Sequence, residues 1–120
     1  MSQVFTLFYV TNVRHSAQFY ADRLGLPILE ESPGFAMLAL PGGAMLGLWL
    51  ARGITPAPTG GPGFGELALT VADADALQAR HADWQAQGTT ILSPPAALDF
   101  GLTFLAADPD GHRLRIFVPA

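Results

Sequence analysis

The chain repeats one order of predicted elements, and this repeat limits its fold more than any other feature of the sequence. In the first half, the residue pattern predicts a strand, a helix and two further strands at residues 4–10, 13–24, 35–40 and 44–50. The helix is expected to end at Gly25, because glycine suits the C-terminal position and Pro27 cannot continue a helix.

The second half shows the same order. A strand, a helix and two strands are predicted at residues 66–71, 73–87, 100–106 and 112–118. Asp73 is a plausible N-cap and Gly88 a stop for this second helix. A loose internal duplication explains the repeated order better than chance does.

The segment between the halves is rich in proline and glycine, which predicts a linker or a mobile loop. We therefore expect a first module at residues 1–51, a linker at 52–64 and a second module at 65–120. A chain of 120 residues suffices for one compact domain and not comfortably for two, so both modules are expected to share a single domain.

Alternation along the predicted strands separates two kinds of face. One face is almost wholly aliphatic, as expected where helices cover a sheet. The other face is aromatic, sulfur-bearing and sparsely polar, and it comprises Phe5, Leu7, Tyr9, Phe35, Met37, Met45, Gly47, Trp49, Glu66, Ala68, Thr70, Phe100, Leu102, Phe104, Arg113, Arg115 and Phe117. A cup for a small, largely apolar ligand needs such a lining.

A plain core or a dimer interface would account for the aromatic residues of this second face almost as well. The charged residues of this face favour the ligand cup; they are Glu66, Arg113 and Arg115. Charged side chains are rarely buried in a core unless they pair with another charge or serve a function.

Composition excludes several classes of function. Half of the residues are hydrophobic, and the net charge of −4 argues against a nucleic-acid partner. The chain has no cysteine, hence no disulfide, thiol nucleophile or thiolate metal site. No signal peptide and no membrane-spanning apolar run is visible, so a cytoplasmic location is expected.

The histidines, the aspartate-containing turn and Trp84 are interpreted as structural or solvent-exposed residues, with no catalytic or metal-binding role. His15 and His81 are expected as solvated helix positions, and His112 at a turn or rim. Asp108-Pro109-Asp110-Gly111 predicts a tight turn, because the remaining ligands of a calcium loop are missing. Trp84 is expected to pack on the sheet.

Several motifs together resemble the glyoxalase/bleomycin-resistance/extradiol-dioxygenase superfamily, also called the vicinal oxygen chelate superfamily. They are Val10-Thr11-Asn12, residues 16–20, residues 24–27, residues 65–71 and residues 108–114. The resemblance covers essentially the whole chain. It implies an α+β fold in which two βαβββ modules form a cupped mixed sheet, usually completed in a homodimer.

Enzymes of this superfamily bind a divalent metal through His, Glu or Gln at four strand positions, which fall here on Phe5, Gly47, Glu66 and Arg115. Only Glu66 offers a ligand, since guanidinium repels a cation. The resemblance therefore implies no metal, no cofactor and no glyoxalase or dioxygenase activity. Glu66 and Arg115 are expected either to pair with each other or to orient a ligand carboxylate on Arg115.

A narrower resemblance links residues 32–37, 46–49 and 99–104 to phenazine-antibiotic resistance proteins, which sequester a planar drug by stacking it on aromatic rings. Trp49 matches the stacking tryptophan, whereas Leu102 stands where that pattern has a tyrosine. The residues expected to contact a planar aromatic ligand are Phe5, Leu7, Phe35, Met37, Gly47, Trp49, Glu66, Phe100, Leu102, Phe104 and Arg115.

Two other functions remain open from the sequence. One is an enzyme of the superfamily with a non-standard metal or none, acting through Glu66 and a nearby histidine. The other is a structural or regulatory dimer whose cup is filled by Phe64 and its neighbours.

Overall fold

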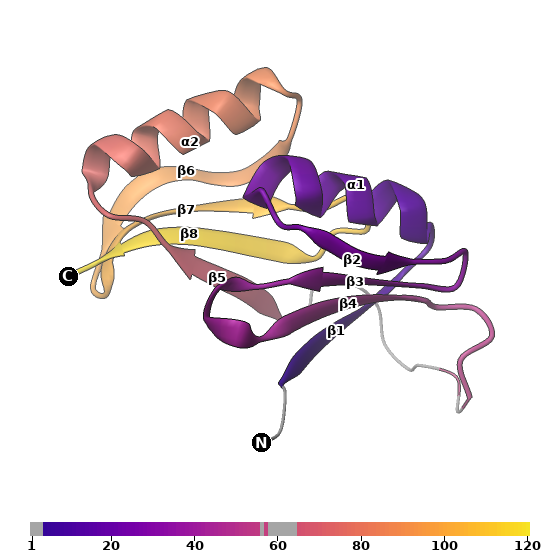
Figure 1. Cartoon of the computed structure of the whole chain (residues 1–120). Helices are drawn as coiled ribbons and strands as arrows, with labels where there is room; N and C mark the ends of the chain where they lie inside the picture. The colour runs from indigo at the N-terminus through magenta and orange to yellow at the C-terminus, as the bar shows by residue number, and fades with distance from the viewer. Residues whose placement is uncertain (1–3, 56, 58–64) are drawn as a thin grey trace. The chain divides into compact units, whose positions relative to one another are not determined.

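The computed structural model describes residues 4–55, 57 and 65–120 (Figure 1). The chain divides into two compact units, Met1–Pro62 and Gly63–Ala120, here called unit 1 and unit 2. Their boundary falls inside the segment 52–64 that was expected to be a linker. Most of that segment, including Phe64, lies outside the described residues.

Unit 1 is a four-stranded mixed sheet with one helix. Its elements are β1 (Phe5–Val10), α1 (Val13–Leu24), β2 (Ile28–Glu31), β3 (Phe35–Ala39), a short 3-10 turn (Pro41–Gly43) and β4 (Met45–Leu50). The strand order is β1-β4-β3-β2, with β1 parallel to β4 and the other neighbours antiparallel.

Unit 2 has the same order and topology. Its elements are β5 (Glu66–Thr70), α2 (Ala74–Ala86), β6 (Thr90–Leu98), β7 (Gly101–Ala107) and β8 (Arg113–Pro119). The strand order is β5-β8-β7-β6, with β5 parallel to β8. The predicted pair of βαβββ modules in an α+β fold is therefore confirmed.

Both helices begin at a side-chain cap, which the sequence predicted at Asp73 but not at Asn12. The Asn12 side chain accepts a hydrogen bond from the backbone N–H of His15 at 2.9 Å, and Asp73 accepts one from Ala76 at 2.8 Å. Gly25 ends α1 with φ of 66°, in the left-handed region that glycine adopts without strain.

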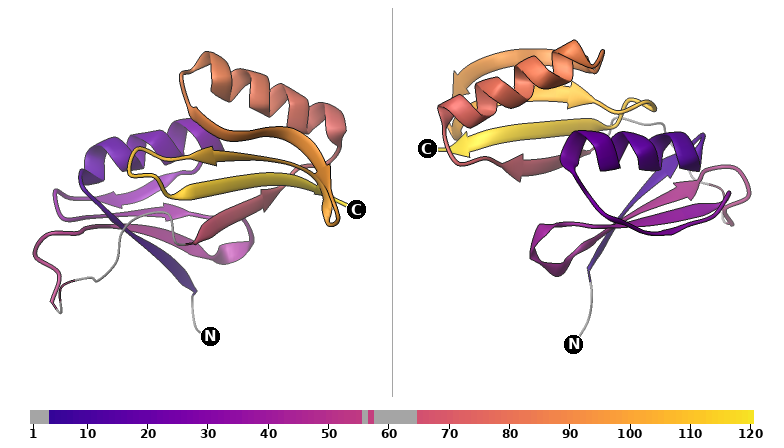
Figure 2. Two further views of the ribbon diagram at one scale, coloured as in Figure 1. Left: turned by 180° about the vertical axis from the view of Figure 1, so that it is seen from behind. Right: turned by 45° about the horizontal axis from the view of Figure 1, so that its top comes forward.

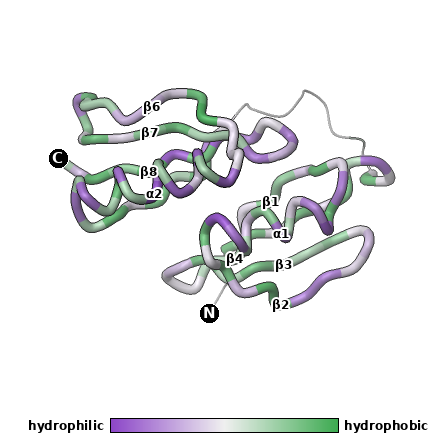
Figure 3. The backbone as a smooth tube through the Cα atoms, turned by 90° about the horizontal axis from the view of Figure 1, so that it is seen from above, coloured by the Kyte–Doolittle hydropathy of each residue, from purple (hydrophilic) through white to green (hydrophobic). Residues whose placement is uncertain are grey.

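Each helix covers one face of its own sheet (Figure 2). In unit 1 the covered face is the expected aliphatic one, and its residues Ala36, Leu38, Leu46 and Leu48 are fully buried. Figure 3 shows hydrophobic residues along β3, whereas α1 alternates between hydrophobic and hydrophilic residues. Within each unit, no helix of the described residues lies on the opposite face of the sheet, so it is the face on which a site can form.

The face of β7 differs from the prediction. Phe104 lies opposite Ile116 in the β7–β8 register, both side chains are fully buried, and Phe104 packs edge-on against Trp84 of α2 with ring centroids 5.5 Å apart. Leu102 lies two residues before Phe104 on the same strand, so it shares this helix-covered face. Leu102 and Phe104 were therefore assigned to the wrong face.

The cause is Gly101. Its φ of 137° is outside the range that other residues adopt, and a Cβ atom there would collide with the backbone oxygen of Val118. The chain turns at this glycine, so the alternation does not continue from Phe100 into β7. Phe100 alone keeps the exposed position that was expected for all three residues.

Candidate functional site

The uncovered face of unit 1 carries an open, apolar hollow of about 450 Å³. It is lined by Phe5 and Leu7 of β1, Phe35 of β3 and Trp49 of β4. These four side chains come together because β4 lies between β1 and β3, with Phe5 opposite Met45 and Phe35 opposite Trp49. All four were among the residues expected to contact a ligand.

Gly47 shapes the floor of the hollow by having no side chain. A Cβ atom at this position would collide with Leu7 Cδ2 and would lie 3.1 Å from Phe35 Cε1. The missing side chain therefore lets Leu7 and Phe35 close over the β4 backbone from its two sides. Met37, opposite Gly47 in the β3–β4 register, is half-buried on the same face.

Trp49 is held in one orientation by two other rings. Phe35 meets it nearly perpendicularly, with centroids 6.3 Å apart, and Tyr9 meets it at 65° with centroids 6.5 Å apart. Trp49 nevertheless stays 41% exposed. A fixed and accessible indole is a suitable surface for stacking a flat molecule.

The uncovered face of unit 2 is organised by an ion pair. Arg115 donates from Nε to Glu66 Oε2 at 2.8 Å and from one terminal nitrogen to Glu66 Oε1 at 2.9 Å. This is the bidentate pairing that was one of the two expectations for these residues. Arg113 adds a longer contact of 4.0 Å to the same carboxylate.

Thr103 completes the surroundings of the guanidinium. Its hydroxyl accepts from the second terminal nitrogen of Arg115 at 3.2 Å and donates to the backbone oxygen of Ile116 at 3.0 Å. The guanidinium also lies 5.6 Å from the ring centroid of Phe100. Phe100 packs edge-on against Phe117 at 5.7 Å, which keeps its ring on the uncovered face.

The ion pair changes the protonation of both partners. The hydrogen bonds from Arg115 hold the pKa of Glu66 below its ordinary value, against a smaller opposing effect of burial. The hydrogen bonds to Glu66 raise the pKa of Arg115 in turn. Glu66 is therefore a carboxylate at neutral pH, and its charge is already neutralised by a partner.

The four superfamily metal positions do not fit a divalent cation. Phe5 and Gly47 have no donor atom, Arg115 is itself a cation, and both oxygens of Glu66 accept hydrogen bonds from Arg115. Within residues 4–55, 57 and 65–120, no three His, Cys, Asp or Glu side chains are grouped so that they could hold a metal ion.

The expected common floor joins residues of both units. Phe5 and Gly47 belong to unit 1, whereas Glu66 and Arg115 belong to unit 2, so this shared floor stays a prediction. Tyr9 and Thr103 were not singled out as site residues by the sequence. Their roles depend on ring packing and on a cross-strand hydrogen bond.

His81 is not the solvated residue that was expected. Its ring packs edge-on against Phe104 with centroids 5.3 Å apart, and its Nε2 atom is buried without a hydrogen-bond partner among the described residues. Trp84 packs on the sheet as predicted and is 1% exposed. Neither helix in the described part of the chain has the length and apolarity needed to cross a membrane.

Comparisons with known proteins agree with this architecture. A protein of Agrobacterium tumefaciens solved in solution is 41% identical, with a TM-score of 0.88 over 100% of this chain and 99% of that one. A glyoxalase-related enzyme from Fulvimarina pelagi is 25% identical, with a TM-score of 0.85 over 98% of this chain and 88% of that one.

Among curated proteins, the phenazine antibiotic resistance protein EhpR of Enterobacter agglomerans is 27% identical over 113 residues, which cover 92% of this chain and 86% of that protein. The family model of the Glyoxalase/Bleomycin resistance protein/Dioxygenase superfamily matches residues 2–116. The chain therefore belongs to the glyoxalase/bleomycin resistance protein/dioxygenase superfamily.

Proposed function

We propose that this protein binds and sequesters a planar aromatic small molecule of the phenazine type, stacked on Trp49 in the hollow of unit 1. The observation that carries the proposal is an indole 41% exposed in a hollow whose lining side chains are all apolar. Such a lining favours a flat, largely apolar ligand over a sugar, a nucleotide or a metal complex.

The energetics of stacking support useful affinity without covalent or metal chemistry. Each aromatic contact adds about 0.5–1.5 kcal/mol beyond area burial. Burial itself contributes about 25 cal/mol per Å² of apolar surface, offset by the entropy of association. Because Tyr9 and Phe35 already orient Trp49, little side-chain ordering remains to oppose binding.

The likeness to the phenazine antibiotic resistance protein of Enterobacter agglomerans supports the biological role. Sequestration lowers the free concentration of a toxic compound without changing it, so resistance would follow from binding alone. This role requires affinity and abundance, and it requires no catalytic group.

Tryptophan fluorescence tests the binding step directly. The chain has two tryptophans, so Trp84→Phe leaves Trp49 as the only one, and excitation selective for tryptophan over the two tyrosines then reports on Trp49 alone. Titration of this variant with phenazine is expected to quench its emission saturably, with a Kd on the order of micromolar. Phe19→Leu, which changes a ring on α1 away from the hollow, is the matched control and should bind as the parent does.

Trp49→Ala removes the proposed stacking surface and is therefore the decisive variant. Its binding is followed by calorimetry, because the substitution also removes the tryptophan whose fluorescence reports on the hollow. A fall in affinity of about tenfold or more is expected when the stacking surface is removed. Unchanged affinity for phenazine and for related flat heterocycles in Trp49→Ala would refute the proposal.

Binding without turnover is a separate part of the proposal. It is supported by the donor set, because Glu66 is the sole candidate ligand at the superfamily metal positions and is already paired with Arg115. Phenazine incubated with the protein should be recovered unchanged by mass spectrometry. A converted product, or one equivalent of metal in protein purified without chelators, would favour the enzymatic alternative instead.

A homodimer is the proposed assembly. Large apolar side chains are exposed on both uncovered faces at 41–45%, namely Phe5, Leu7, Tyr9, Trp49 and Phe100. Phe5, Leu7, Tyr9 and Trp49 lie on one face of the unit 1 sheet, and contiguous exposed apolar surface of this kind often marks an interaction site. Light scattering at tens of micromolar protein should give twice the mass of the 12.7 kDa chain, and a monomer mass would contradict the proposal.

A further inference from the structure

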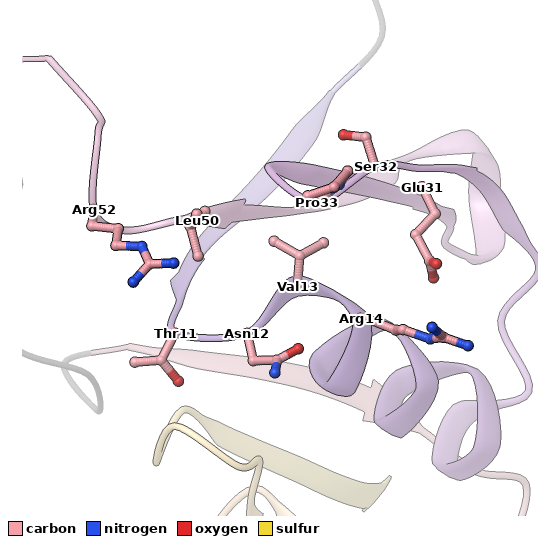
Figure 4. Close-up of a pocket in the computed structure, with 9 residues that line it drawn as sticks. All are labelled: Thr11, Asn12, Val13, Arg14, Glu31, Ser32, Pro33, Leu50 and Arg52. Atoms are coloured by element: carbon pink, nitrogen blue, oxygen red, sulfur yellow. The ribbon is translucent and has the colours of Figure 1, made fainter.

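Unit 1 has a second cavity, of about 470 Å³, which shares no lining residue with the aromatic hollow (Figure 4). It lies where α1 begins, between the turn after β2 and the chain that leaves β4. Its lining residues are Thr11, Asn12, Val13, Arg14, Glu31, Ser32, Pro33, Leu50 and Arg52.

The cavity combines an apolar middle with charged ends. The Val13 and Leu50 side chains project into its middle, while Arg52 lies at one end and Arg14 and Glu31 lie at the other (Figure 4). Val13 is 2% exposed and belongs to the packed core, so this part of the lining is firmly positioned.

The charged side chains have no partners within the described part of the chain. Neither Arg14, Glu31 nor Arg52 forms an ion pair or a hydrogen bond through its side chain there. The nearby polar groups are already used, because Asn12 caps α1 and the Ser32 hydroxyl contacts the backbone of Phe35. The two arginines are the cationic groups of this lining, so they offer the strongest anchors for an anionic ligand.

We propose that this cavity binds a small monocarboxylate with an apolar ring or chain, whose carboxylate is held by Arg52. The planar guanidinium fork matches a carboxylate with two parallel hydrogen bonds. Arg52 stands apart from Glu31, whereas Arg14 lies at the same end as Glu31, whose negative charge disfavours an anion there (Figure 4). The hydrocarbon part of the ligand then lies against Leu50 and Pro33, above the buried Val13.

The same charges argue against a phosphate. A phosphate dianion gains most from several converging cations, but the two arginines lie at opposite ends of the cavity (Figure 4). Glu31 would also repel a second negative charge. A single negative charge on an apolar body is the chemistry that this lining fits.

Benzoate and benzamide form a matched pair of probes, because they share one shape and differ in charge. Two-dimensional NMR of the isotope-labelled protein should show saturable benzoate shifts at Thr11, Val13 and the Arg52 side chain, and much smaller shifts with benzamide. The Trp49 indole signal is followed in the same spectra, so binding in the aromatic hollow is recognised separately.

Substitutions of the arginines test which side chain binds the carboxylate. Arg52→Gln should weaken benzoate binding by about tenfold, Arg52→Lys should lose less because it keeps a cation, and Arg14→Gln should have the smaller effect. Arg80→Gln on α2 is the control and should bind as the parent protein does. Benzoate that binds Arg52→Gln as well as the parent, or benzamide that binds as tightly as benzoate, would overturn the proposal.

Discussion

Arg115 and Glu66 form a bidentate ion pair across two parallel strands of unit 2, with N···O distances of 2.8 and 2.9 Å. Both residues stand at positions where enzymes of the superfamily place metal ligands. At these two positions the chain has a neutral pair of charges, and the guanidinium of Arg115 lies beside the ring of Phe100.

The pair makes stability depend on pH. The pKa of Glu66 is lowered from the ordinary 4.5, so its contribution is fully present above pH 4.5 and is lost as pH falls through the folded-state value. Glu66→Gln should cost about 1 kcal/mol or less at pH 7, because the Glu66 side chain is 31% exposed, and it should flatten the acid dependence.

Urea unfolding at pH 7 and at a series of values below 4.5 measures this effect. Glu30→Gln on β2 is the control, since the Glu30 carboxylate is exposed and has no partner in the described residues. An equal fall in stability with acid in Glu66→Gln and in the parent would show that the pair does not cause it.

Among the described glycines of unit 1, Gly47 is the one at which an added Cβ atom would meet its neighbours. In Gly47→Ala, the new methyl group would meet Leu7 and Phe35, so both side chains must move. Because Leu7 is exposed and its Cδ2 is the end of a flexible side chain, we expect a loss of about 1 kcal/mol or less in the free energy of unfolding. Phenazine binding should weaken, because the floor of the hollow changes shape.

The matched control is Gly34→Ala, where the new methyl group meets nothing within 4 Å and φ is ordinary. This variant should change the free energy of unfolding by less than about 0.5 kcal/mol. Denaturant midpoints give the stability of the two variants, and titrations give their affinity for phenazine. Equal stability and equal affinity in both variants would show that Gly47 does not shape the site.

Much of the fold follows from the sequence because local signals agree with each other. Asn12, Gly25 and Asp73 delimit the two helices at or within one residue of the predicted positions. The alternation along β1, β3 and β4 also separates the helix-covered face from the aromatic face in unit 1. Periodicity works there because these strands have no break in register.

The two strands missing from the residue patterns lie at sheet edges. β2 is exposed along its whole length, so it carries no alternating burial that a pattern could reveal. β6 contains Pro94 and Pro95, and its register with β7 shifts twice. Proline is tolerated at such an edge, but it makes the segment resemble a loop in the sequence.

The error at Leu102 and Phe104 has a different origin. Alternation assigns faces only while the backbone stays extended, and Gly101 leaves the extended region at the start of β7. The sequence shows that a glycine stands at the start of this strand, but it does not show which φ angle the glycine adopts. The contact of Thr103 with Arg115 was missed for the same reason, because it requires the corrected face.

Two nearby phenylalanines should therefore respond very differently to truncation. Phe104 is fully buried between the sheet and Trp84, so Phe104→Ala should cost about 3–5 kcal/mol. Phe100 is 43% exposed, so Phe100→Ala should cost about 1 kcal/mol or less. Urea unfolding of both variants tests the corrected face of β7, and equal losses would contradict it.

His81 offers a gain in stability. Its Nε2 atom is buried without a partner in the described part of the chain, and a buried polar atom without a hydrogen bond carries a desolvation penalty. His81→Phe keeps an aromatic ring against Phe104 and removes the polar atom, so the free energy of unfolding should rise by about 1 kcal/mol. His15→Phe, on the exposed start of α1, should give no gain. A melting temperature of His81→Phe at or below that of the parent would contradict the expected gain.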